Sequence, residues 1–129
     1  MDFPPFLIYY IIMFSYLGGK KFQAKWIGSH FPTSKKYVEP FGGAFWVYFQ
    51  NGIEFDKNVY NDYNRFLTNI FYCARNKHNE FVKELKKYEP QKRDLFEQIK
   101  NELVPLNYNF ELGDVEKAAK YLYIELNTF

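Results

Sequence analysis

The sequence has very little cysteine and histidine. Its 129 residues include a single cysteine, Cys73, and two histidines, His30 and His78. A lone cysteine cannot form a disulfide within the chain, which favours a reducing, cytoplasmic setting. Neither histidine has ligand-like companions in the sequence, so we predict no metal site.

Long hydrophobic runs are also missing. The longest apolar run, Phe6 to Phe14, has nine residues, whereas a membrane-spanning helix needs roughly 20. The run also lacks the basic flank and the small-residue cleavage site of a signal peptide. We therefore expect no membrane partner and treat residues 1–12 as an apolar amino-terminal extension with no assigned function.

A strong charge of one sign is absent as well. The formal net charge is +2, and 47% of the residues are hydrophobic. Such a composition indicates a folded chain and argues against disorder. The small positive charge is compatible with nucleic-acid contact but does not require it.

The most informative stretch is residues 36–47. Its aromatic and β-branched residues before Pro40 suit a strand. Pro40 is expected to end the strand, because proline has no N–H to donate to a neighbouring strand. Gly42 and Gly43 then supply a tight turn against which a ligand can lie. The apolar run at residues 44–49 is expected to begin a helix whose first amides face a carboxylate or phosphate.

A second short strand follows about 20 residues beyond the glycines, the spacing that nucleotide-binding units use for their ribose-binding acid. It runs over residues 58–62 and ends in Asp62. The spacing predicts a βαβ unit that holds a nucleoside, with the ribose hydroxyls on Asp62. The alternative is a glycine turn between two elements of any α/β protein. The dinucleotide fingerprint is not present, because Phe45 and Trp46 follow where a third glycine would stand.

Three short motifs occur in a fixed order. They are Phe14-Ser15-Tyr16-Leu17-Gly18-Gly19-Lys20, Tyr37-Val38-Glu39-Pro40-Phe41-Gly42-Gly43-Ala44 and Tyr60-Asn61-Asp62-Tyr63-Asn64. In this order and at these gaps the chain resembles the amino-terminal part of Dam-type adenine-specific DNA methyltransferases, from about Met13 to Phe129. The resemblance implies an α/β chain: a partial Rossmann-like S-adenosylmethionine-dependent methyltransferase fold with an added helical segment.

The resemblance also implies which residues surround S-adenosylmethionine. Tyr16 would stack on the cofactor, Lys20 would reach its carboxylate and Asp62 would hold its ribose. The full expected set is Tyr16, Gly18, Gly19, Lys20, Glu39, Pro40, Phe41, Gly42, Gly43 and Asp62. A cation near the amino-acid end of the cofactor makes chemical sense, although a solvated lysine beside a glycine turn is the ordinary alternative.

The sequence departs from the family pattern in two ways, at three residues. Phe45 and Trp46 stand where relatives commonly carry small residues, so they could narrow the cofactor pocket or fill space in an incomplete domain. Tyr16 stands where many relatives have Trp, a change that keeps a stacking face. The first departure bears on cofactor affinity and not on ancestry.

The chain is expected to divide into two segments at residue 77, and both contain helices. Residues 13–76 form the cofactor-binding βαβ part, and residues 77–129 form a helical segment that the resemblance equates with the start of a DNA-recognition region. A first helix is expected over Lys21–Ile27, ended by Gly28, and a second over residues 65–76, capped by Asn64. Two amphipathic helices follow; Pro90 separates them and Pro105 ends the second. The last helix is expected over Val115–Leu126, capped by Asp114. Cys73 falls on the buried stripe of the second helix and is expected to be a small core residue.

The lysines of residues 77–104 alternate with apolar residues and with acids. One interpretation is a DNA-contacting surface; the other is an ordinary solvated helix face. The interleaved acids balance the charge and favour the solvated face.

No Asp-Pro-Pro-Tyr occurs in the sequence. In the family that motif holds the flipped adenine, so the chain is interpreted as an amino-terminal fragment with no catalytic residue of its own. Double-stranded DNA would be the substrate of the complete, bacterial or phage-encoded enzyme, and the carboxy-terminal half could lie on another polypeptide. Two other functions stay open: a catalytically inactive cofactor- or DNA-binding module, and an unrelated Rossmann-type nucleotide-binding protein.

Overall fold

A computed structural model describes residues 16, 19–51, 55–88 and 92–128. The elements, in chain order, are α2 (Ala24–Ser29), β1 (Lys36–Glu39), α3 (Trp46–Asn51), β2 (Lys57–Tyr60), α4 (Arg65–Asn76), α5 (His78–Leu85), the 3₁₀ turn η1 (Lys86–Tyr88), α6 (Arg93–Leu103), the 3₁₀ turn η2 (Val104–Leu106) and α7 (Val115–Asn127). The predictions for residues 1–12, Gly18 and Pro90 lie outside the described residues. No helix in the described ranges is long and apolar enough to cross a membrane.

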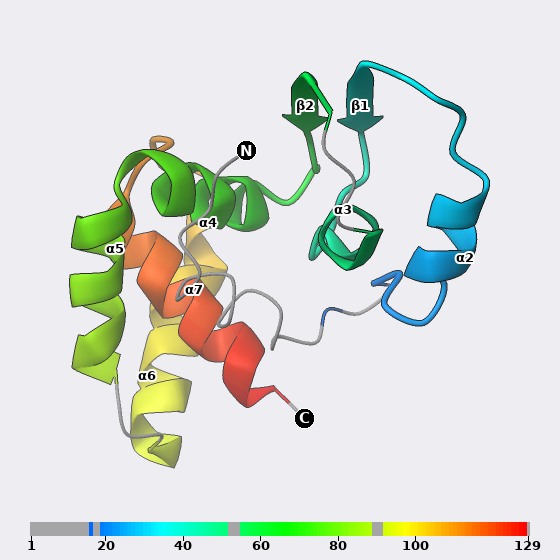
Figure 1. Ribbon diagram of the computed structural model, residues 1–129. Coiled ribbons are helices and arrows are strands. Elements are labelled where there is room, and N and C mark those ends of the chain that lie inside the picture. Colours follow the sequence, from blue (N-terminus) through cyan, green and yellow to red (C-terminus); the bar gives the residue numbers. More distant parts are fainter. Residues whose placement is uncertain (1–15, 17–18, 52–54, 89–91, 129) are drawn as a thin grey trace.

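The first part of the chain is a βαβ unit, as predicted. β1 and β2 pair in parallel, with Val38 opposite Val59, and α3 lies between them in the sequence. Figure 1 shows the two strands side by side above α3, with α2 beyond it. Tyr37 on β1 packs against Tyr48 of α3, with ring centroids 5.7 Å apart. The chain is therefore α/β, and the sheet formed by the described residues has two strands.

Side chains on the opposite face of this sheet are exposed. Val38 is 60% exposed and its register partner Val59 is 37% exposed. Parallel sheets are normally covered on both faces, because their crossovers place helices there. The described residues therefore supply one layer over the sheet and leave the second face open.

Phe45 lies in the core and not over the glycine turn. Its backbone takes a left-handed conformation, with φ of 60°, and its side chain is fully buried. Its ring stacks on Tyr48 at 4.5 Å and meets the edges of Tyr60 and Phe71. The Phe45 ring therefore fills space in the core of the βαβ unit.

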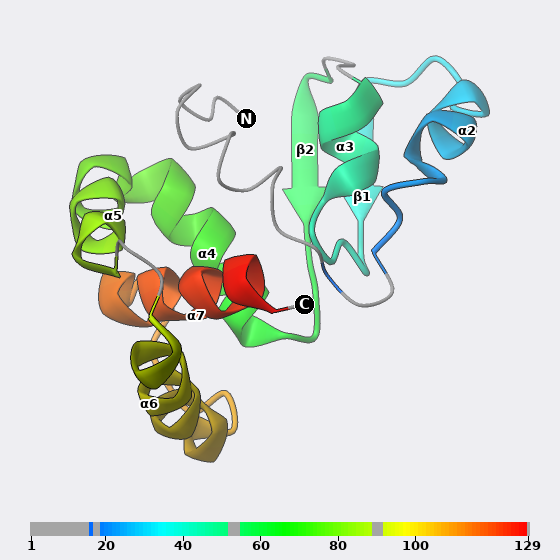
Figure 2. The ribbon, with the colours of Figure 1, turned by 90° about the horizontal axis from the view of Figure 1, so that it is seen from below.

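The second part of the chain is helical. Asn64 caps α4 by accepting a hydrogen bond from the Phe66 amide, and Asp114 caps α7 by accepting one from the Lys117 amide. Both caps are those predicted, and α4 ends at the predicted residue. Cys73 is fully buried, and burial raises the pKa of its thiol to about 12, as expected of a core residue. α7 packs against α4, α5 and α6, and Figure 2 shows it lying among them.

Asn69 fixes the start of α7 against α4. Its side chain is fully buried, accepts a hydrogen bond from the Gly113 amide at 2.7 Å and donates to the Asp114 carbonyl at 2.8 Å. A buried amide that lost these partners would be costly. The link joins α4, the helix that follows β2, to the start of α7.

The prediction for the helix after Lys20 was wrong in its bounds. α2 begins at Ala24 and passes through Gly28 to Ser29. Gly28 does not stop it, and its missing side chain makes room for Asn51 of α3, which occupies the place of a Cβ at this position. Asn51 also donates to the Ala24 carbonyl at 2.9 Å. The glycine is therefore a contact point between two helices.

Candidate cofactor site

The carboxyl ends of β1 and β2 are joined backbone to backbone. The Asn61 amide donates to the Glu39 carbonyl at 2.9 Å, and the Gly42 amide donates to the Asn61 carbonyl at 2.9 Å. The Asn61 side chain adds a bond to the Pro40 carbonyl at 3.0 Å. The Glu-Pro-Phe-Gly-Gly and Asn-Asp motifs, 20 residues apart, thus form one surface at the end of the sheet.

Asp62 links the glycine turn to the residues before α4. One carboxylate oxygen accepts a hydrogen bond from the Gly43 amide at 2.8 Å, and the other accepts one from the Asn64 amide at 2.8 Å. Gly43 has φ of 53°, which a residue with a Cβ adopts only at a cost. Asp62 therefore holds the glycine turn in place and also positions the start of α4.

Each glycine of the turn is close to a tyrosine ring. A Cβ on Gly42 would lie 2.2 Å from the Tyr60 ring, and one on Gly43 would lie 3.3 Å from the Tyr16 ring. Tyr60 also donates its hydroxyl to the Gly43 carbonyl at 2.7 Å. The sequence suggested that the glycines make room for a ligand, but at Gly42 it is Tyr60 that needs the space.

The amides of the turn are already bonded within the protein. Gly42 donates to Asn61, Gly43 to Asp62, and Phe45 to the Gly42 carbonyl at 2.8 Å. The sequence predicted that the first amides of residues 44–49 face an anionic ligand, and the Phe45 amide is instead bonded within the protein. α3 is also short, spanning six residues.

Lys20 is the cation at the glycine turn. Its ammonium donates to the Phe41 carbonyl at 2.9 Å and lies 3.9 Å from the Glu39 carboxylate. Glu39 is 8% exposed, and its other oxygen accepts the Tyr37 hydroxyl at 2.6 Å. Burial raises the pKa of Glu39, while the Tyr37 bond and the Lys20 charge oppose that shift. Glu39 thus anchors Lys20 from inside the fold.

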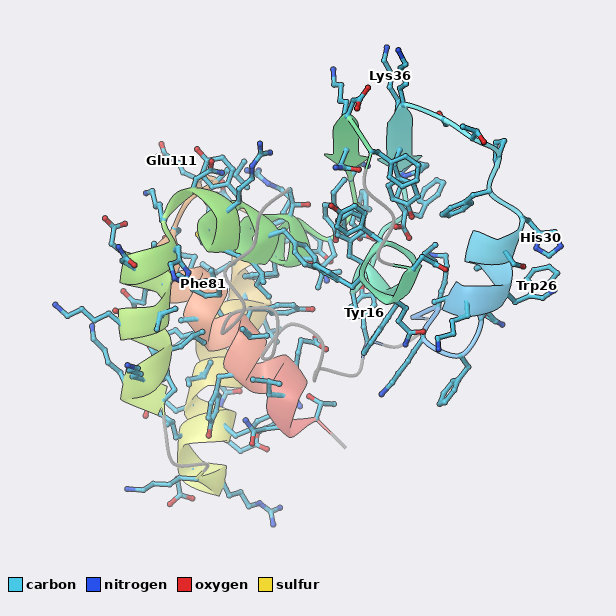
Figure 3. All side chains as sticks on the ribbon, viewed as in Figure 1. Tyr16, Trp26, His30, Lys36, Phe81 and Glu111 are labelled. Carbon is cyan, nitrogen blue, oxygen red and sulfur yellow. The ribbon has the colours of Figure 1, made fainter. Side chains whose placement is uncertain are left out.

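Asn64 connects the site to the helical segment. Besides capping α4, its side chain donates to the Tyr121 hydroxyl of α7 at 2.9 Å and to the Tyr16 hydroxyl at 3.4 Å. Figure 3 shows Tyr16 between the βαβ unit and the helices. Burial raises the pKa of the Tyr16 hydroxyl, so it stays neutral and can share these bonds. The sequence predicted only the cap, because nothing in it indicated the approach of α7.

Two aromatic rings at this end of the sheet face solvent. Phe41, after β1, is 75% exposed, and Tyr63, after Asp62, is 83% exposed. Phe41 was in the predicted set, whereas Tyr63 was missed. Its place next to Asp62 was the available signal. Exposed rings beside Asp62 give a flat ligand apolar surface to contact.

The residues present fit a nucleoside-containing amino acid such as S-adenosylmethionine. A carboxylate has about four acceptor sites, and Asp62 uses one on each oxygen, so ribose hydroxyls can still be accepted. Lys20 has three N–H donors and a side chain that is 37% exposed. Among the described residues, no cluster of His, Cys, Asp and Glu could hold a metal ion.

Comparison with protein families identifies the family to which the chain belongs. The model of the D12 class N6 adenine-specific DNA methyltransferase family matches residues 16–129. The chain belongs to this family, whose members are enzymes that methylate DNA at N6 of adenine. No curated protein and no solved structure gave a significant match.

Proposed function

We propose that this chain is the S-adenosylmethionine-binding part of a site-specific adenine DNA methyltransferase. The observation that carries the proposal is the hydrogen bond that the Asp62 carboxylate accepts from the Gly43 amide. It places an acid and a glycine turn together at the carboxyl ends of two adjacent parallel strands, where open α/β sheets bind their ligands.

Each side chain has a distinct role in the proposed complex. Asp62 accepts the ribose hydroxyls, and Lys20 meets the carboxylate of the amino-acid end. Phe41 and Tyr63 provide apolar faces for the base. When bound, S-adenosylmethionine supplies an activated methyl group, and the chain contributes by binding and orienting it, which accounts for a large share of the rate in a two-substrate reaction.

Holding the adenine requires residues that these 129 do not include. Chemistry on a base needs a pocket for the flipped nucleotide, and the family's Asp-Pro-Pro-Tyr motif is not in the sequence. The exposed sheet face around Val38 and Val59 supports a fold completed by further elements. These would come from additional sequence or from a second polypeptide.

Double-stranded DNA is the proposed partner of the completed enzyme. In the helical segment Lys87 pairs with Glu84, and Lys120 lies between Glu102 and Glu116. These pairs neutralise part of the basic charge. This segment alone is therefore expected to hold duplex DNA weakly and to lose it as salt rises.

The proposal is tested by titrating the full chain with S-adenosylmethionine and, separately, with ATP. ATP shares the adenosine but carries a triphosphate in place of the amino acid. Saturable binding of S-adenosylmethionine, at least about tenfold tighter than that of ATP, supports the proposal; equal affinities would point to a general nucleotide site.

A further inference from the structure

A strip of unusually exposed side chains lies along α2, away from the cofactor site. Phe22, just before the helix, is 96% exposed, and Trp26, one turn later, is 68% exposed. Lys25 is exposed beside Trp26, and His30 follows the helix. Figure 3 shows Trp26 and His30 projecting from α2 away from the sheet. We call Phe22, Lys25, Trp26 and His30 the α2 strip.

The strip lies in the most basic part of the chain. Residues 20–38 contain five lysines and no Asp or Glu. Among the described residues, no ion pair involves Lys25. Within this stretch Lys20 lies 3.9 Å from the Glu39 carboxylate and Lys21 lies over the Trp46 ring, so Lys25 is the basic residue of the strip itself. The charge around the strip is therefore complementary to a polyanion.

The Trp26 ring is held by its neighbours, although it is exposed. His30 lies against it with ring centroids 4.6 Å apart and donates its Nδ1 hydrogen to the Trp26 carbonyl at 2.8 Å. A ring fixed before binding loses less conformational freedom when a ligand stacks on it.

We propose that the α2 strip binds unpaired nucleotides of a DNA strand. Bases stack on Phe22 and Trp26, and Lys25 contacts a phosphate. Aromatic platforms beside basic side chains are how proteins hold single strands without sequence preference. A paired base does not offer its face, because the face is stacked within the duplex. The site is separate from the glycine turn and does not depend on cofactor binding.

A membrane surface is the main competing partner for exposed aromatics and lysines. The structure disfavours it, because α2 has six residues and its Ala24 is fully buried against the fold. An interfacial helix instead inserts a continuous apolar face into the lipid. The experiment therefore includes anionic vesicles, which test binding to a membrane surface.

The test is fluorescence titration of the full chain with an oligothymidylate of about 12 nucleotides, a duplex of equal length, and phosphatidylserine–phosphatidylcholine vesicles. Exposed Trp26 reports binding, while Trp46 is 4% exposed and gives a constant background. Phe22→Ala and Lys25→Glu are each expected to weaken single-strand binding about tenfold or more. The matched controls are Tyr72→Ala on α4 and Lys83→Glu on α5, which are expected to change it less than about twofold.

Salt dependence provides a second readout. A single-strand contact contributes roughly 0.7 to the slope of log affinity against log salt, so Lys25→Glu should reduce the slope by at least about that amount. Four outcomes overturn the proposal: no single-strand binding by the parent, equal effects in the controls, duplex binding as tight as single-strand binding, or vesicle binding that depends on the same residues. Melting curves of each variant establish that it is folded.

Discussion

The carboxylate of Asp62 accepts a hydrogen bond from the Gly43 amide at 2.8 Å. This bond ties the acid that follows β2 to the turn that follows β1, 19 residues earlier. It means that Asp62 has two roles in this account. It holds the turn, and in the proposed complex it also binds ribose, so experiments on Asp62 must separate stability from affinity.

The first prediction concerns the fit of Gly42 against Tyr60. In Gly42→Ala the new methyl group would lie 2.2 Å from the Tyr60 ring, so the variant should be destabilised by about 1–3 kcal/mol or more. Urea unfolding measures the change. Tyr60→Leu in the same chain should recover part of the loss, because a smaller side chain relieves the clash. Simple additivity of the two single changes would contradict this contact.

The second prediction concerns Lys20. Lys20→Met should weaken S-adenosylmethionine binding about tenfold, because one charge-assisted bond to the cofactor carboxylate is lost. Its effect on the free energy of unfolding should stay below about 1 kcal/mol, since the side chain is partly exposed. Lys35→Met, which alters an exposed lysine in the loop before β1, is the matched control. Calorimetric titration of both variants with S-adenosylmethionine measures their affinities. An equal loss of affinity in the two variants would show that Lys20 does not bind the cofactor.

The third prediction concerns pH and Glu39. Burial raises the pKa of Glu39 in the folded chain above its ordinary 4.5. The folded state therefore binds a proton more tightly than the unfolded state, and stability falls as pH rises from 4.5 through the raised value. Glu39→Gln should flatten this part of the stability profile while keeping an acceptor for the Tyr37 hydroxyl. Urea unfolding across the acidic range checks it, and an unchanged profile would show that Glu39 is not the group responsible.

The fourth prediction concerns catalysis. Purified alone, these 129 residues should not transfer labelled methyl from S-adenosylmethionine to mixed-sequence duplex DNA, because the sequence does not contain the family's adenine-binding Asp-Pro-Pro-Tyr motif. Adding a polypeptide that carries the Asp-Pro-Pro-Tyr half should restore transfer. Sequence-specific adenine methylation by the chain alone would show that another residue replaces the motif.

Local patterns in the sequence predicted the βαβ unit well. Proline and glycine constrain the backbone directly, and the caps at Asn64 and Asp114 follow from local hydrogen bonding. The second strand was predicted over residues 58–62, but β2 spans Lys57–Tyr60, so Asp62 lies just after the strand and does not end it. Local patterns could not show that Phe45 turns into the core, because that depends on a positive φ and on rings from other elements.

The candidate site was predicted in part for the same reason. Lys20, Gly43 and Asp62 were chosen from motifs, and the structure brings them together at the end of the sheet. Tyr60 and Asn64 were missed because their roles arise from contacts across the fold: one fills the space over Gly42 and the other reaches Tyr121. Motifs do not encode such distant contacts.

The measurement that tests the central claim most directly is S-adenosylmethionine binding by Asp62 variants, compared with their stability. Asp62→Asn keeps one acceptor oxygen for the turn but loses the charge, so affinity should fall about ten- to a hundredfold while the chain stays folded. Asp62→Ala should also lose about 1–3 kcal/mol of stability, because the Gly43 amide loses its partner. Asp56→Asn, at an exposed carboxylate before β2, should change neither. Parent-like affinity in folded Asp62→Asn, or no saturable binding by the parent, would contradict the account.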